Sequence, residues 1–132
     1  MNKLENITNL TNKVALITGG GSGIGFRIAE QFINLGAKVV ITGRDLTKLE
    51  KAKERLGTQC YFYCNDVTKK KGHNDLIKII EEKVGPIEIL VNNAGKHQKK
   101  NSLEVTDLEF LDVIDTNVNS IFSLTRAVLK FM

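Results

Sequence analysis

The sequence has few of the features that mark specialised classes of protein chain. It contains one proline and two cysteines among 132 residues, with 11 glycines, and this composition excludes collagen-like and disulfide-rich chains. A hydrophobic share of 42% beside 26% charged residues also excludes a disordered chain. No apolar run approaches the roughly 18 residues that a membrane-spanning helix needs. What remains is a globular chain whose length suits a single domain.

Targeting signals and long charged tracts are lacking as well. Residues 1–13 are polar and have no apolar core of the kind that a signal peptide carries, so we expect a cytoplasmic protein with no membrane partner. The net charge of +4 comes largely from two short basic runs, at residues 69–71 and 96–100. Short basic runs are more typical of solvated loops than of nucleic-acid interfaces. We therefore expect no nucleic-acid partner.

The two cysteines lie close together in one apolar run, at Cys60 and Cys64. Four residues along a strand span about 13 Å, which is too far for a disulfide. Two cysteines also fall short of the four ligands of a structural zinc site. We expect both to be buried, reduced thiols, and we predict no metal site.

Short apolar runs alternate with longer segments of helical period, which predicts an α/β fold. Strands are expected at residues 14–18, 38–42, 59–64 and 87–91, and helices at 24–35, 46–56, 75–84 and from 106 onward. The strands are apolar throughout, as in a parallel sheet that is covered on both faces. The β-α order with short loops then predicts a doubly wound parallel sheet, that is, a Rossmann fold in one domain.

Helical spacing also predicts which side chains face the core. In the first helix the expected buried stripe is Ile24, Ile28, Phe32 and Leu35. In the third helix it is Leu76, Ile79 and Ile80. The last helix is expected to begin with a capping box, in which Thr106 and Glu109 satisfy backbone donors reciprocally.

A glycine-rich loop joins the first strand to the first helix. It reads T-G-G-G-S-G-I-G over residues 18–25 and has the pattern T-G-x-x-x-G-x-G, while the dinucleotide fingerprint G-x-G-x-x-G is absent. Glycine lets the backbone approach a ligand closely, and a helix N-terminus attracts a pyrophosphate. A tight turn with glycines for packing alone is the alternative. The predicted cofactor-binding residues of this loop are Gly19, Gly21, Ser22, Gly23, Ile24 and Gly25.

Further motifs follow the glycine loop in a fixed order. They are Asp66 with Val67, Asn-Asn-Ala-Gly at residues 92–95, and Asn117 with Val118. Together with the loop, they make nearly the whole chain resemble the short-chain dehydrogenase/reductase family of the classical type. The resemblance implies an oxidoreductase in which hydride passes between a nicotinamide cofactor and a small carbonyl or alcohol substrate.

The resemblance also implies roles for single residues. Ser22 and Ile24 would contact the cofactor phosphates, and Asp66 would bind the adenine amino group while Val67 packs on the ring. A stretch that would line the adenosine ribose and brace the central strand consists of Asn93, Ala94 and Gly95.

The end of the second strand bears on the choice between NAD and NADP. NAD enzymes usually place a carboxylate there for the ribose 2′-hydroxyl, but this chain has Gly43 followed by Arg44. A guanidinium can bind a 2′-phosphate through paired, charge-assisted hydrogen bonds, so we predict NADP rather than NAD. In the alternative, Arg44 is a surface residue and Asp45 binds the hydroxyl. Asp45 is better explained as a cap of the following helix.

One catalytic residue of the family pattern is present. Asn117 stands where the resemblance implies an asparagine that holds a water in the proton relay, and Asn119 is a nearby rival. The family's serine and Tyr-x-x-x-Lys are absent, because neither Tyr61 nor Tyr63 has a lysine four residues later. We therefore expect residues 1–132 to form the cofactor-binding half of an enzyme, incomplete at the C-terminus and inactive alone.

An incomplete domain leaves apolar surface uncovered. We expect the fourth strand to be an exposed sheet edge, which favours aggregation, and the apolar face of the last helix to lack its cover. The residues expected on that face are Ile121, Phe122, Leu124 and Val128. The resemblance implies that this helix packs against a second subunit in a homodimer or homotetramer.

Other readings stay open. The chain could be a short nucleotide-binding protein without catalysis or a decayed copy of an enzyme, and the first strand and loop alone would also suit a methyltransferase-like binder. The substrate is open as well: residues 95–107 resemble gluconate 5-dehydrogenases, whereas the general body equally resembles 3-oxoacyl-carrier-protein reductases. The basic residues at 96–100 could meet an anionic substrate or form a solvated loop.

Overall fold

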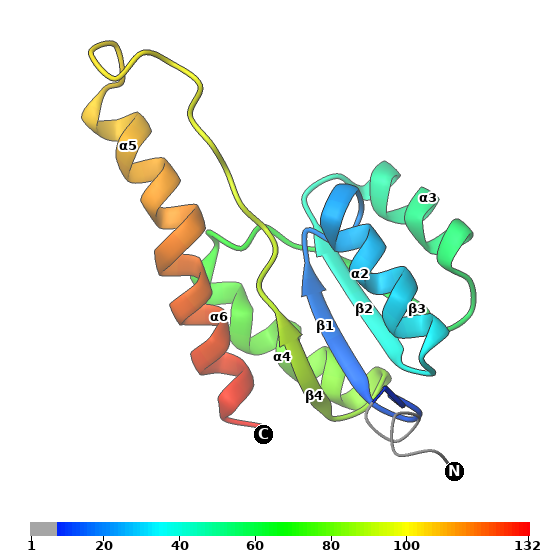
Figure 1. The fold of residues 1–132 in the computed structure, drawn as a ribbon. Coiled ribbons are helices and arrows are strands. Elements are labelled where there is room, and N and C mark those ends of the chain that lie inside the picture. The colour runs from blue at the N-terminus through cyan, green and yellow to red at the C-terminus, as the bar shows by residue number, and fades with distance from the viewer. Residues whose placement is uncertain (1–7) are drawn as a thin grey trace.

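The computed structural model describes residues 8–132, which form a four-stranded parallel sheet with helices on both faces (Figure 1). The order of the strands across the sheet is β3-β2-β1-β4, so the predicted doubly wound parallel sheet is confirmed. The strand bounds are β1 (Val14–Thr18), β2 (Lys38–Gly43), β3 (Cys60–Cys64) and β4 (Ile87–Val91). All five residues of β1 are buried, as expected for a strand with neighbours on both sides and helices on both faces.

The helices form one layer on each face of the sheet (Figure 1). One layer is α2 (Gly23–Asn34) and α3 (Leu46–Leu56). The other layer is α4 (His73–Lys83), preceded by the short helix η1 (Lys70–Gly72), and a long helical rod. The rod consists of α5 (Asp107–Ile114), the π-helical turn η2 (Asp115–Asn119) and α6 (Ser120–Leu129). It begins with the predicted capping box of Thr106 and Glu109.

The core consists of two apolar clusters, one on each face of the sheet. Because side chains alternate along a strand, β1 contributes to both clusters: Val14 and Leu16 pack toward α4 and α6, whereas Ala15 and Ile17 pack toward α2 and α3. The sheet thus holds the two helical layers together through its central strand.

The predicted buried stripe of α2 is wrong at its ends. Ile24 is 75% exposed and Leu35 is also exposed, and the buried residues are instead Gly25, Phe26 and Ala29. Gly25 is the physical reason. Because it has no side chain, the start of α2 can pack closely against the preceding loop, with the face that carries Gly25, Phe26 and Ala29 turned inward. Helix α4 also differs from its predicted buried stripe. Ile79 is exposed, whereas Ile77, two residues earlier, is fully buried.

The two cysteines differ from each other in burial. Cys60 is buried, and this burial raises the pKa of its thiol to about 11. Cys64 is exposed, so the prediction that both thiols are buried is wrong for this residue. Cys64 is the last residue of β3, an edge strand of the described sheet, where the strand leaves the core. Both thiols are free, as expected.

The uncovered surfaces match the predictions only in part. Within the described sheet, β4 pairs with β1 alone and is an edge strand, as expected. In α6, Phe122 is exposed, but Leu124 and Val128 are buried in the core beside α4. The expectation that these two residues lack cover is therefore wrong, because α4 supplies it. Among residues 8–132, none of the helices has the length and apolar character needed to cross a bilayer.

Candidate functional site

A cavity of about 770 Å³ lies at the carboxyl ends of the strands. Parallel sheets bind ligands at this edge, at the point where the chain switches direction across the sheet. The predicted site residues that line the cavity are Gly19, Gly21, Ser22, Arg44, Asp66, Val67, Asn93, Ala94 and Gly95. The predicted residues that do not line it are Gly23, Ile24, Gly25 and Asn117.

The glycine loop crosses the cavity wall, and its last glycine has a packing role. A Cβ on Gly25 would lie 2.4 Å from the carbonyl oxygen of Gly19 and 2.5 Å from Nδ2 of Asn93, distances that no side-chain carbon tolerates. Gly19 itself has a φ of +65° and carries the turn out of β1, a conformation that favours glycine. The absence of a side chain at Gly25 therefore lets the start of α2 pack closely against the loop.

A buried hydroxyl next to the loop was not among the predicted site residues. Thr18, the last residue of β1, accepts hydrogen bonds from the backbone N–H of Asn93 at 3.1 Å and of Ala94 at 2.9 Å. In the other direction, the side-chain amide of Asn93 donates hydrogen bonds to the carbonyl oxygens of Thr18 and Gly19, both at 3.1 Å. These bonds join the segment after β4 to the glycine loop. Thr18 is the first residue of the T-G-x-x-x-G-x-G pattern, and this position is the signal in the sequence that could have identified it.

Arg44 and Asp45 follow β2 at one end of the cavity and differ in their contacts. Asp45 is the N-cap of α3, and its carboxylate accepts a hydrogen bond from the backbone N–H of Lys48 at 3.1 Å. The predicted capping role of Asp45 is confirmed. Arg44 is exposed and lines the cavity, and so does Lys48, one helical turn further on. Asp45 lines the cavity as well, so this end presents two cationic side chains beside one carboxylate that is engaged as a cap.

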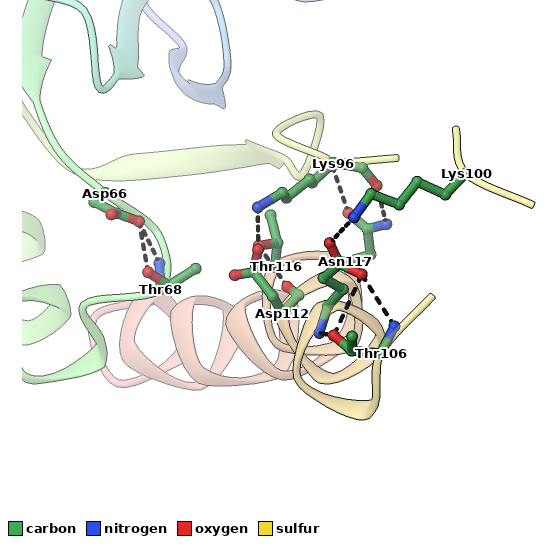
Figure 2. A network of polar contacts seen from close by, with 9 residues as sticks. Asp66, Thr68, Lys96, Lys100, Thr106, Asp112, Thr116 and Asn117 are labelled. Atoms are coloured by element: carbon green, nitrogen blue, oxygen red, sulfur yellow. Dashed lines mark hydrogen bonds and ion pairs between the residues drawn. The ribbon is translucent and has the colours of Figure 1, made fainter. Parts of the chain in front are cut away.

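Asp66 lies beyond the end of β3, in a turn that holds its carboxylate in place. Its Oδ1 accepts from the backbone N–H of Thr68 at 2.9 Å and from the Thr68 hydroxyl at 2.7 Å (Figure 2). The hydroxyl bond is the main cause that holds the pKa of Asp66 below its usual value. The carboxylate is therefore ionised at neutral pH, and its second oxygen is available as an acceptor for a donor in the cavity.

Two buried polar atoms beside the cavity have no hydrogen-bond partner among the described residues. They are Oγ1 of Thr42, in β2, and Oδ1 of Asn65, just after β3, and both residues line the cavity. A buried polar atom without a partner costs free energy, so these atoms favour a polar ligand here. The sequence patterns did not single out either residue.

Asn117 lies in the π-helical turn η2 and binds the main chain that follows β4. Its Oδ1 accepts from the backbone N–H of Lys96 at 2.8 Å, and its Nδ2 donates to the Lys96 carbonyl oxygen at 2.6 Å (Figure 2). The rival Asn119 donates instead to Asp115, within the same helix. A π-helical turn is rare and often occurs at functional sites. Thr116, next to Asn117, lines the cavity.

The basic segment after β4 is partly neutralised by the rod. Lys96 pairs with Asp112, and Lys100 pairs with Glu109 (Figure 2). These pairs are exposed and therefore contribute little to stability, but they occupy two of the cations that were considered for an anionic substrate. His97 and Lys99 are exposed in the same segment. Lys96 also lines the cavity, whereas Lys100 does not.

The comparison with protein families identifies the family to which this fold belongs. The family model described as short chain dehydrogenase matches residues 13–132. The chain belongs to the short-chain dehydrogenase family. Members of this family are oxidoreductases, so the family predicted by resemblance is confirmed, and no observation supports the methyltransferase-like reading.

Several short-chain dehydrogenases resemble the chain over most of its length. The NADP-dependent (R)-specific alcohol dehydrogenase of Lentilactobacillus kefiri is 38% identical over 125 residues, which are 93% of this chain and 50% of that protein. Gluconate 5-dehydrogenase of Gluconobacter oxydans is 35% identical over 127 residues, 94% of this chain and 50% of that protein. The crystal structure of 2-keto-3-deoxy-D-gluconate dehydrogenase from Streptococcus agalactiae has a TM-score of 0.85 and 39% identity, covering 98% of this chain and 50% of that one. The chain thus spans about half the length of the relatives it matches.

Proposed function

We propose that the chain binds NADP in the cavity at the carboxyl ends of the strands. In this proposal it is the cofactor-binding half of an enzyme that transfers hydride between the nicotinamide and a carbonyl or alcohol substrate. The observation that carries the choice of cofactor is at the end of β2, where Arg44, Asp45 and Lys48 line the cavity and the Asp45 carboxylate is already engaged as a helix cap. The resulting positive charge favours a 2′-phosphate.

The other lining residues suit the remaining parts of a dinucleotide. The loop at the N-terminus of α2, with Gly21 and Ser22, would hold the pyrophosphate, because the free N–H groups and the dipole of a helix N-terminus attract anions. Asp66 would accept the adenine amino group, and Val67 would pack on the ring. The unpartnered atoms of Thr42 and Asn65 support a polar ligand between these two ends.

Ile24 would contribute its predicted loop contact to the phosphates through the main chain. Its side chain is exposed on α2 outside the cavity, so any contact with the cofactor phosphates would use its backbone N–H in the first turn of the helix. Gly23 and Gly25 would act through the shape of the loop. Asn93, Ala94 and Gly95 line the cavity beside Thr18 and would border the adenosine ribose.

The bound nicotinamide would accept or deliver the hydride, and the chain would position it. Asn117 is the one residue of the chain for which we propose a part in the proton relay. Its side chain is engaged with Lys96, so we propose that its main-chain carbonyl in the π-helical turn would hold the water. Tyr61 and Tyr63 lie in β3 and take no part. Residues 1–132 alone would bind the cofactor without turning over a substrate.

Isothermal titration of the full-length protein with NADP⁺ and with NAD⁺ tests this proposal. A 2′-phosphate bound by charge-assisted hydrogen bonds should make NADP⁺ bind about 10- to 100-fold more tightly than NAD⁺. Equal affinities, or tighter binding of NAD⁺, would contradict the NADP assignment. Binding without turnover of any carbonyl or alcohol by the full-length protein would favour the alternative, a non-catalytic nucleotide-binding protein.

Substrate, assembly and location stay at the level of proposals. The relatives named above act on an alcohol and on gluconate derivatives, and we propose a small carbonyl or alcohol compound as the substrate class.

We also propose a homodimer or homotetramer, supported by the exposed apolar side chains along the α5–α6 rod, which include Leu111, Val118, Phe122 and Leu129. Sedimentation of the full-length protein would test this assembly. The cytoplasmic location remains a prediction from the sequence.

A further inference from the structure

His73 is a titratable side chain that the cavity does not use directly. It is the first residue of α4 and is only 1% exposed, and it does not line the cavity. Burying an imidazole ring costs free energy unless its nitrogens form hydrogen bonds. Both nitrogens of His73 have partners, and the partners come from two different parts of the fold.

The two contacts define the tautomer of the ring. Nε2 lies 2.9 Å from the carbonyl oxygen of Val67, and Nδ1 lies 3.0 Å from Oγ of Ser123 in α6. A carbonyl oxygen only accepts, so Nε2 carries the hydrogen and donates it. In the neutral ring Nδ1 then accepts from the Ser123 hydroxyl. His73 therefore links the segment after β3 to α6.

The residue that His73 contacts belongs to the wall of the cavity. Val67 lines the cavity next to Asp66, and both lie in the segment that leads from β3 to η1. A second contact connects the same region to the rod, because Lys70 pairs with Asp115 at 2.8 Å. That ion pair is exposed and therefore weak. The buried His73 bridge is the stronger link, since its hydrogen bonds are shielded from water.

We propose that His73 is a positioning residue for the adenosine end of the cofactor. By fixing the Val67 carbonyl against α6, it sets where the Asp66 carboxylate and the Val67 side chain meet the adenine ring. The inference rests on the proposed binding of NADP in this cavity. His73 does not line the cavity and acts through Val67, so we expect its effect to be confined to ligands that include the adenosine half.

Two substitutions separate the contacts of the ring. In His73→Gln, the side-chain amide nitrogen reaches the place of Nε2 and can still donate to Val67. In His73→Asn, the shorter amide reaches only the place of Nδ1, so the Val67 carbonyl loses its donor. The probes, used with the full-length protein, are adenosine 2′,5′-bisphosphate for the adenosine half and reduced nicotinamide mononucleotide for the other half.

We expect His73→Asn to weaken binding of the bisphosphate about tenfold and His73→Gln to weaken it less than threefold. Binding of the mononucleotide should be the same in both variants and in the wild type. If His73→Asn lowers the melting temperature but leaves the affinity for the bisphosphate unchanged, His73 only packs the core and the inference is overturned. Equal losses for both probes would overturn it as well.

Ser123→Ala is a second variant that serves if His73→Asn does not fold. It keeps the ring and removes its partner in α6, and we expect a loss of about threefold for the bisphosphate alone. An unchanged affinity would contradict the inference. Failure of the wild-type protein to bind the bisphosphate is a different result, because it would overturn the proposed NADP site itself and with it the role of His73.

Discussion

The side-chain amide of Asn93 donates to the carbonyl oxygen of Thr18, and the Thr18 hydroxyl accepts from the backbone N–H of Asn93, so that the two residues bind each other reciprocally. This pair joins the end of β1 to the chain that leaves β4. Because both ends border the cavity, the pair keeps the glycine loop and the segment at residues 93–95 at a constant separation. Asn93, which would border the adenosine ribose, thereby also helps to hold the sheet together.

Thr18→Val tests this joint. Valine has nearly the shape of threonine, but it cannot accept hydrogen bonds from the backbone N–H groups of Asn93 and Ala94. We expect the free energy of unfolding to fall by about 1–3 kcal/mol, measured by urea denaturation. Thr47→Val, at an exposed position in α3, is the matched control and should change stability by less than about 0.5 kcal/mol. Equal midpoints for Thr18→Val and the wild type would refute the structural role.

Gly25→Ala tests the close approach of α2 to the glycine loop. The new methyl group would lie 2.4 Å from a backbone oxygen that cannot move freely, and overpacking of this kind costs about 1–3 kcal/mol. Thermal unfolding should therefore show a clear decrease in Tm. Gly72→Ala is the control, because a Cβ there meets open space. An unchanged Tm in Gly25→Ala would show that the loop can move away from α2, and it would contradict the packing role of Gly25.

Arg44→Gln tests the cofactor preference. The substitution removes the guanidinium but keeps a polar side chain, so the affinity for NADP⁺ should fall about tenfold or more, while the affinity for NAD⁺ should stay the same. Titration calorimetry on the full-length protein measures both. Lys51→Gln removes an equal charge from α3 at a position that does not line the cavity and should change neither affinity. Parallel losses for NADP⁺ and NAD⁺ would argue against a 2′-phosphate contact at Arg44.

Asn117→Ala tests the contact between the π-helical turn and the chain after β4. Both hydrogen bonds to the Lys96 main chain would be lost, and we expect a decrease of about 1–2 kcal/mol in the free energy of unfolding. Asn119→Ala removes a single exposed contact with Asp115 and should cost less than about 0.5 kcal/mol. Chemical denaturation compares the two variants. A larger cost for Asn119→Ala would reverse the assignment of these asparagines.

The pH dependence of stability should carry the signature of His73. Burial is the main cause that lowers the pKa of His73 below its ordinary value. The unfolded chain then binds the proton more tightly than the folded protein does, so the contribution of His73 to stability is complete above about pH 6.5, the ordinary histidine pKa. It decreases as the pH falls below that value and levels off below the folded pKa.

Urea denaturation between about pH 8 and pH 5 measures this dependence across the ordinary histidine pKa. We expect the wild type to lose more stability over this interval than His73→Gln, whose side chain does not titrate. His97→Gln is the control, because His97 is exposed, and it should retain the slope of the wild type. Identical slopes for the wild type and His73→Gln would contradict a buried, neutral imidazole.

The local pattern of the sequence determined the elements of this protein and their order. Continuous apolar runs such as Val14–Thr18 predict strands that are buried on both faces, and the structure contains the four predicted strands in one parallel sheet. The helix signals are equally local: Thr106 and Glu109 form their capping box within one turn, and Asp45 caps α3 from the adjacent position. Such features depend on neighbours in the chain, so one sequence is enough to predict them.

Only the tertiary structure decided which side of an element faces inward and which polar atoms stay without a partner. Ile24 and Ile79 lie on apolar stripes and are nevertheless exposed, because the rotation of a helix depends on where its close contact with the sheet lies. The unpartnered oxygens of Thr42 and Asn65 become evident only in the folded chain. The hydrogen bond between His73 and Ser123 joins residues that are 50 positions apart. Periodicity contains no information on such contacts, because they form only when the β3–α4 segment packs against α6.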